Sequence, residues 1–164
     1  MRLAGRRSAR TVGEVSASHP VVAQTVLDCP RPRVLAEFYR ELLGYAYRPG
    51  DETPPAGEPD PRGEDWLVIR PERDAPAAGR GLAFQANAAY AAPVWTPGPD
   101  RPGDQQMMLH LDLTVPDVAS LEAQRARVLA LGGTELYDRS DDEDEPLYVF
   151  ADPAGHPFCI FVAG

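Results

Sequence analysis

Apolar and polar residues follow two regular spacings from Val21 onward, one typical of strands and one typical of helices. Val21 to Cys29 is rich in β-branched and apolar residues and stops at Pro30, which predicts a strand. Behind Pro32, apolar residues recur at helical spacing from Val34 to Leu43, and Gly44 follows as a helix stop. A strand and then a helix are therefore expected at the start of the folded part.

Further elements follow in the same order in both halves of the chain. In the first half, strands are predicted at Tyr45 to Arg48, Trp66 to Arg70 and Gly81 to Asn87, with a long loop at Pro49 to Glu64. In the second half, the predicted elements are a strand at Met107 to Val115, a helix capped by Asp117 and running to Leu131, and strands at Thr134 to Tyr137, Leu147 to Ala151 and Pro157 to Val162. The acidic run Asp141 to Glu145 is predicted to be a solvated loop.

Two segments of the first half align with two segments of the second. Gln24 to Arg31 can be laid over His110 to Asp117, and Gly81 to Gln85 over Gly155 to Cys159. We therefore predict an α+β protein of two βαβββ modules. The predicted domains are a disordered leader at 1–20, a first module at 21–87, a proline-rich connector at 88–105 and a second module at 106–164.

Charge and composition exclude several classes of partner. The net charge is −9, and all 16 basic residues are arginines, clustered only at Arg2 to Arg10, so nucleic acid is not an expected partner. No apolar run approaches the roughly 18 residues that span a bilayer, so no membrane partner is expected and a cytoplasmic location is predicted. Cys29 and Cys159 each lie in an apolar stretch, which predicts two buried, reduced thiols rather than a disulfide.

Four pieces of the chain carry a resemblance to a known family: Leu35 to Gly44, His110 to Asp117, Ala130 to Gly133 and Asp152 to Cys159. Their order and spacing resemble the vicinal oxygen chelate superfamily, in particular its glyoxalase-like branch. The resemblance implies a curved, partly open mixed sheet around a central cleft that holds a small molecule. It also implies a homodimer.

The resemblance implies four cleft positions, one on the first and one on the last strand of each module. Superposing the motifs places Gln24, Gln85, His110 and Cys159 there. Metal-dependent members use His, Glu or Gln at these positions, and this chain departs from them at Cys159, where glutamate is typical. None of the four is a carboxylate.

The two-residue period of a strand independently predicts a polar cleft lining. It sends His110 and Asp112 to one face and their apolar neighbours to the other, and it groups Gln24 with Asp28. Trp66 and Trp95 are candidates to stack on a planar ligand, although tryptophan at such positions also serves as core or interface cover. His156 is interpreted as a turn residue. The predicted ligand-binding residues are Gln24, Asp28, Trp66, Gln85, Trp95, His110, Asp112 and Cys159.

Three functions are compatible with this lining. The first is a binding protein that traps a small molecule without a metal. The second is a metal-dependent lyase, isomerase or dioxygenase with Gln24, Gln85 and His110 as ligands, which is disfavoured because two amides and an imidazole bring no negative charge to a divalent cation. The third is metal-free catalysis in which Asp28 or Asp112 acts as a general base, with a pKa that burial raises toward neutrality. The sequence does not identify a catalytic residue, cofactor or substrate.

Overall fold

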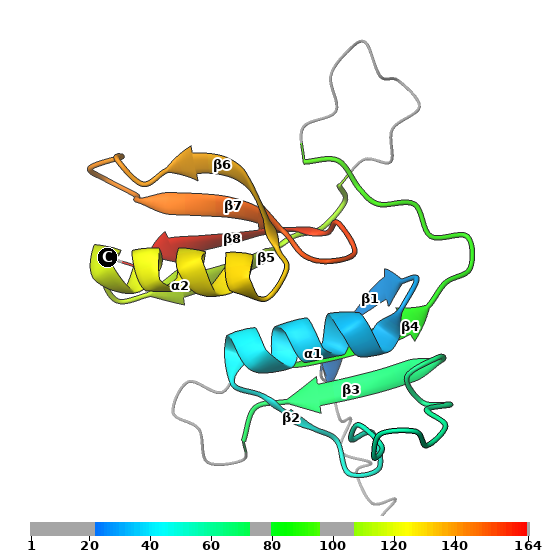
Figure 1. The fold of residues 1–164 in the computed structure, drawn as a ribbon. Helices are drawn as coiled ribbons and strands as arrows, with labels where there is room; N and C mark the ends of the chain where they lie inside the picture. The colour runs from blue at the N-terminus through cyan, green and yellow to red at the C-terminus, as the bar shows by residue number, and fades with distance from the viewer. Residues whose placement is uncertain (1–21, 73–79, 96–106, 164) are drawn as a thin grey trace, which may run out of the picture.

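The computed structural model describes residues 22–72, 80–95 and 107–163. The predicted leader at 1–20 and the connector residues 96–105 lie outside the described residues. Eight strands and two helices are present in the described part, in the order β-α-β-β-β twice over (Figure 1). The predicted α+β fold of two βαβββ modules is therefore confirmed, and the two sheets are open rather than closed.

The first module is a four-stranded sheet with one helix on it. Its strands lie in the order β1-β4-β3-β2, with β1 parallel to β4 and the other pairs antiparallel. The elements are β1 (Gln24–Cys29), α1 (Pro32–Leu43), β2 (Ala46–Tyr47), β3 (Trp66–Arg70) and β4 (Gly81–Ala86).

The second module repeats this plan. Its strands lie in the order β5-β8-β7-β6, again with the first and last strands parallel. The elements are β5 (Leu111–Val115), α2 (Val118–Ala130), β6 (Thr134–Arg139), β7 (Leu147–Ala151) and β8 (Pro157–Val162). Neither helix of the described residues is long and apolar enough to cross a membrane.

Strand boundaries differ from the predicted ones where pairing, rather than local pattern, decides them. β5 begins at Leu111, opposite Phe158, and not at Met107 as predicted. The residue before Phe158 is Pro157, which has no amide hydrogen to extend the ladder. β6 runs two residues further than predicted, to Arg139, because that residue still pairs with Leu147.

The shared apolar core lies between the modules, and α1 is at its centre. The Tyr39 ring stacks on Phe84 of β4 at 5.9 Å and meets Phe158 of β8 edge-on at 6.1 Å. Phe38 also contacts Phe158, with ring centroids 5.9 Å apart. Each sheet therefore turns its apolar face toward this core, and the opposite, more polar face of each sheet points away from it.

Candidate functional site

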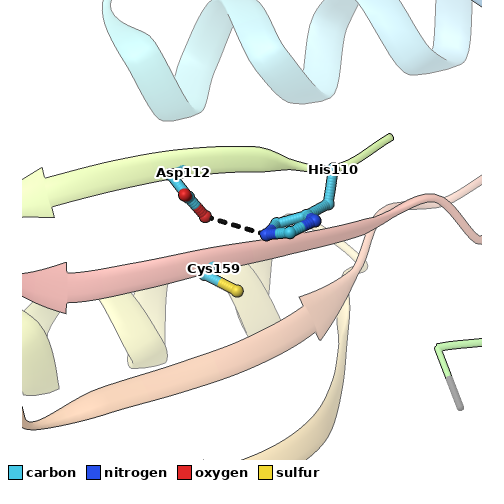
Figure 2. Close-up of side chains that lie close together, drawn as sticks. All are labelled: His110, Asp112 and Cys159. Atoms are coloured by element: carbon cyan, nitrogen blue, oxygen red, sulfur yellow. Dashed lines mark ion pairs between the residues drawn. The ribbon is translucent and has the colours of Figure 1, made fainter. Parts of the chain in front are cut away.

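Three predicted site residues of the second module come together on the polar face of its sheet. His110 lies directly before β5, Asp112 is on β5, and Cys159 is on the neighbouring strand β8 (Figure 2). Asp112 and Cys159 are register partners in the parallel β5–β8 pair. One ligand atom from each of the three lies within 4.8 Å of the others, and His110 Nε2 is 3.1 Å from Asp112 Oδ1.

The three side chains differ in their access to solvent and in their protonation chemistry. The Asp112 side chain is 60% exposed and that of His110 33% exposed, whereas Cys159 is only 8% exposed. Burial and the nearby Asp112 carboxylate raise the pKa of the Cys159 thiol to about 11. Near neutral pH the thiol is therefore protonated and serves as a weak hydrogen-bond donor at the bottom of the cluster.

The set of His110, Asp112 and Cys159 fits a divalent cation better than the ligands predicted from sequence, which are Gln24, Gln85 and His110. Imidazole nitrogen, carboxylate oxygen and thiolate sulfur are all zinc ligands, and the latter two bring negative charge. A bound cation would lower the pKa of the Cys159 thiol and oppose the effect of burial. The sequence pattern indicates Asp112 as a polar lining residue and as a base, but not as a metal ligand.

The predicted residues of the first module form a separate row on their own sheet. Asp28 on β1 pairs with Gln85 on β4, and Gln85 pairs in turn with Trp66 on β3. Gln24 lies at the other end of β1, opposite Gly81, four residues or roughly 13 Å from the Asp28 position. The structure therefore does not gather Gln24, Gln85 and His110 into one cluster.

The strand register also changes the correspondence between the modules. If Gln24 matches His110, then Val26 matches Asp112, and its partner Ala83 matches Cys159. The alignment of sequence motifs instead matches Cys159 with Gln85, which lies two residues further along β4 than Ala83. The shift arises because Gly81 is opposite Gln24, whereas Gly155 lies in a turn before β8 begins.

Trp95 lies beside the His110 cluster, whereas the two predicted bases are on the surface. Trp95 packs edge-on against the His110 ring, with centroids 5.5 Å apart, so one of the two tryptophans lies at the His110 cluster. Asp28 and Asp112 are both exposed in the single chain. Within the described residues, neither carboxylate has the burial that the hypothesis of metal-free catalysis requires.

A polar network outside the predicted set was not recognised in the sequence. His156 lies in the predicted turn, where its Nδ1 is 2.8 Å from the buried carboxylate of Asp152. Its Nε2 is 3.2 Å from the hydroxyl of Tyr90, which itself donates to the Ala154 carbonyl at 2.9 Å. The Asp-Pro-Ala-Gly-His sequence indicates the turn, but nothing local indicates that Tyr90 reaches it from 66 residues away.

The model of the glyoxalase-like domain matches residues 24–161, which is most of the chain and both modules. The chain belongs to the glyoxalase-like domain family. This membership confirms the resemblance to the vicinal oxygen chelate superfamily. None of the curated proteins matches this glyoxalase-like chain.

Solved structures with the same fold are distant in sequence. A glyoxalase/bleomycin resistance protein/dioxygenase family enzyme from Burkholderia phytofirmans PsJN is 13% identical, with a TM-score of 0.56, covering 85% of this chain and 96% of its own. A glyoxalase-related enzyme from Fulvimarina pelagi is 18% identical, with a TM-score of 0.56, covering 87% and 88%. A lactoylglutathione lyase from Agrobacterium tumefaciens is 12% identical, with a TM-score of 0.51, covering 90% and 96%. At these identities the likeness concerns the fold alone.

Proposed function

We propose that this glyoxalase-like protein binds a small polar or aromatic molecule at the His110, Asp112 and Cys159 cluster. The observation that supports the proposal is the convergence of an imidazole, a carboxylate and a thiol on the face of the second sheet that points away from the apolar core. Such a set offers hydrogen-bond donors and acceptors, and Trp95 beside His110 adds an aromatic surface. A few convergent polar groups beside an aromatic side chain are typical of ligand sites.

Isothermal titration tests this proposal with bleomycin and a panel of aromatic antibiotics, a choice prompted by the name of the Burkholderia relative. At least one compound is expected to bind with a Kd below about 1 mM. The Asp112→Asn variant should weaken that binding about tenfold, since it removes a charged hydrogen-bond partner. The Asp141→Asn variant, which changes an exposed carboxylate in the β6–β7 loop, is the matched control. Absence of binding across the panel would count against the proposal.

A second candidate function is a metal-dependent lyase, isomerase or dioxygenase. The spacing of the three ligand atoms, within 4.8 Å of one another, supports this candidate. His110, Asp112 and Cys159 would hold the cation, which when bound would polarise oxygen atoms of a substrate. The protein's own part is to orient these three side chains from the paired strands β5 and β8 and to place Trp95 beside them.

Equilibrium dialysis with Zn²⁺, Ni²⁺, Mn²⁺ and Fe²⁺ separates the two candidates. A metal-dependent protein should retain close to one equivalent, and Asp112→Asn and Cys159→Ala should each release most of it while Asp141→Asn does not. Retention of less than about a tenth of an equivalent for every ion would remove this candidate, because catalytic sites hold their metal through several protein ligands.

The functional unit is further proposed to be a homodimer joined near the edge strand β6. Leu136 and Tyr137 on this strand are 42% and 50% exposed. An apolar hollow lined by Pro93, Val94, Trp95, Leu136, Ala151 and Gly155 adjoins the same edge. Exposed edges with apolar side chains favour association with another chain.

Light scattering after size exclusion tests the dimer with two matched variants. Leu136 on β6 and Leu129 on α2 are nearly equally exposed, at 42% and 43%. Leu136→Lys should reduce the mass to that of one chain, 17.8 kDa, whereas Leu129→Lys should leave a dimer. A wild-type protein that elutes as a monomer at about 100 µM would contradict the proposal, since that concentration far exceeds the Kd of a stable dimer.

A further inference from the structure

A cavity separate from the His110 cluster lies between the two modules. It has a volume of about 540 Å³ and is bounded by the end of β1, residues 87, 89–91 and 93 after β4, residues 108–109 and His156. His110, Asp112 and Cys159 are not among its lining residues. A volume of this size is typical of sites for small organic molecules.

The apolar part of the lining is unusually exposed in the described chain. Val26, Met108 and Leu109 all line the cavity and are 42%, 91% and 62% exposed. Large apolar side chains rarely stay exposed together on a protein surface. Their grouping around one cavity is typical of a surface that binds an apolar molecule. The cavity therefore favours a ligand with an apolar body.

The charge of the lining residues determines which sign of charge the ligand should carry. Among the described lining residues, Asp28 is the one acidic side chain, and neither arginine nor lysine is present. Asn87 Nδ2 donates to Asp28 Oδ2 at 3.0 Å, and the carboxylate keeps further acceptor positions. The chain as a whole carries a net charge of −9, which adds to the attraction for cations.

Tyr90 contributes an aromatic wall that is held in place by hydrogen bonds. Its hydroxyl donates to the Ala154 carbonyl and contacts His156, which is bonded to the buried Asp152. Burial and the nearby Asp152 raise the pKa of Tyr90, so its ring stays neutral at physiological pH. Any charge on His156 is balanced by Asp152 at 2.8 Å, which leaves Asp28 as the carboxylate available to a ligand.

We propose that this cavity is a binding site for an organic ammonium ion with an apolar ring system. The ammonium group would bind the Asp28 carboxylate, and the ring would lie against Val26, Met108, Leu109 and Tyr90. The site is distinct from the one in the proposed function and does not depend on it. Binding at either site can be tested while the other is left intact.

Isothermal titration in low-salt buffer with three indole probes of different charge tests this site. Tryptamine is a cation at neutral pH, tryptophol is its neutral counterpart, and indole-3-propanoate is an anion. The wild-type chain should bind tryptamine about tenfold more tightly than tryptophol and should not bind indole-3-propanoate, because only the ammonium makes a charge-assisted hydrogen bond. The tryptamine preference should weaken with added salt.

Asp28→Asn should abolish the preference for tryptamine over tryptophol and leave the affinity for tryptophol unchanged. An asparagine at this position still accepts the hydrogen bond from Asn87, so the fold is expected to persist, and circular dichroism checks this. Asp141→Asn is the matched control and should keep the preference. Equal binding of tryptamine and tryptophol by the wild type, a preference retained in Asp28→Asn, or no tryptamine binding at about 10 mM would each overturn the proposal.

Discussion

Tyr39 and Asp152 show how a single buried polar contact ties the two modules together. The Tyr39 hydroxyl on α1 donates to Asp152 Oδ2 at 3.0 Å, across 113 residues of sequence. Tyr39 is fully buried and Asp152 is 4% exposed. The carboxylate also accepts the backbone amides of Ala154 and His156, so it is well satisfied without water. This contact links the helix of one module to the turn that carries His156 in the other.

Tyr39→Phe should destabilise the protein by about 1 to 3 kcal/mol, since it removes one hydrogen bond from a buried carboxylate without opening a cavity. Urea unfolding measures the loss. Tyr45→Phe, at a half-buried tyrosine away from the proposed dimer edge, is the control and should change stability by less than about 0.5 kcal/mol. Equal stability of the two variants would show that the hydrogen bond from the Tyr39 hydroxyl to Asp152 does not stabilise the fold.

The two cysteines are expected to be unreactive in the folded chain. Both are free and buried, as the sequence predicted, and burial raises the pKa of each to about 11. At pH 8 only about one thiol in a thousand is ionised at such a pKa, and the thiolate is the reactive form. Iodoacetamide should label neither cysteine within minutes at pH 8 and both in urea, as read by mass spectrometry. Rapid labelling of the folded protein would contradict the buried placement.

The same thiols predict a loss of stability at alkaline pH. Their pKa in the folded state, about 11, lies above the ordinary value of 9.0 that applies in the unfolded chain. Their contribution to stability is complete below pH 9 and is lost as the pH rises toward 11. Urea midpoints at pH 8 and pH 10.5 measure the decline. The Cys29→Ala, Cys159→Ala double variant should show a shallower decline than the wild type, and an equal or steeper one would contradict the prediction.

At the level of elements, the ends of α1 are encoded by the residues that the sequence pattern indicated. Pro32 begins the helix, where its missing amide hydrogen costs nothing. Gly44 ends it in the left-handed region at φ 66°, and its backbone amide bonds to the Arg40 carbonyl. Helix ends follow local rules, and they were therefore predictable.

Gly44→Ala should cost about 1 kcal/mol, because a Cβ is unfavourable at this positive φ although nothing lies within 4 Å of its position. Gly44→Asn should cost less, since asparagine tolerates the left-handed conformation. Thermal unfolding of the two variants measures the difference. If the alanine variant matched or exceeded the asparagine variant in stability, the end of α1 would not have the conformation described.

At the level of the whole molecule, the two modules share one core rather than each having its own. Phe158 of β8 contacts both Phe38 and Tyr39 of α1. A core that crosses the module boundary implies that neither module is stable without the other. The protein should therefore unfold in a single cooperative transition.

Phe158→Ala should remove about 3 to 5 kcal/mol by leaving a cavity in this core. In a Trp95→Phe background, the fluorescence of Trp66 reports the first module, and circular dichroism reports both modules. The two transitions should coincide and shift together in Phe158→Ala, although the substitution lies in the second module. Phe161→Ala, at a half-buried residue outside the core cluster, is the control and should cost less. Separate transitions would contradict a shared core.

Local patterns in the sequence are enough to specify the strands and helices, the duplication of the module and the face on which each side chain lies. His110 and Asp112 are two residues apart at the start of β5, so the alternation of side chains along extended backbone places them on the same face whatever the strand pairs with. Helix ends, buried cysteines and the turn around His156 follow from equally local chemistry. These features depend on the nearest few residues, and a single sequence contains that information.

Which sheet faces meet, and in which register the strands pair, became known only from the folded chain. Cys159 lies beside Asp112 because β8 pairs in parallel with β5. Gln85 lies two residues along β4 from the position that corresponds to Cys159, contrary to the alignment of motifs. Tyr90 contacts His156, and α1 packs between the two sheets. Both arrangements depend on contacts between residues that are far apart in the chain. Such pairings are selected by the packing of the complete core, where many contacts compete at once, so no local pattern specifies them.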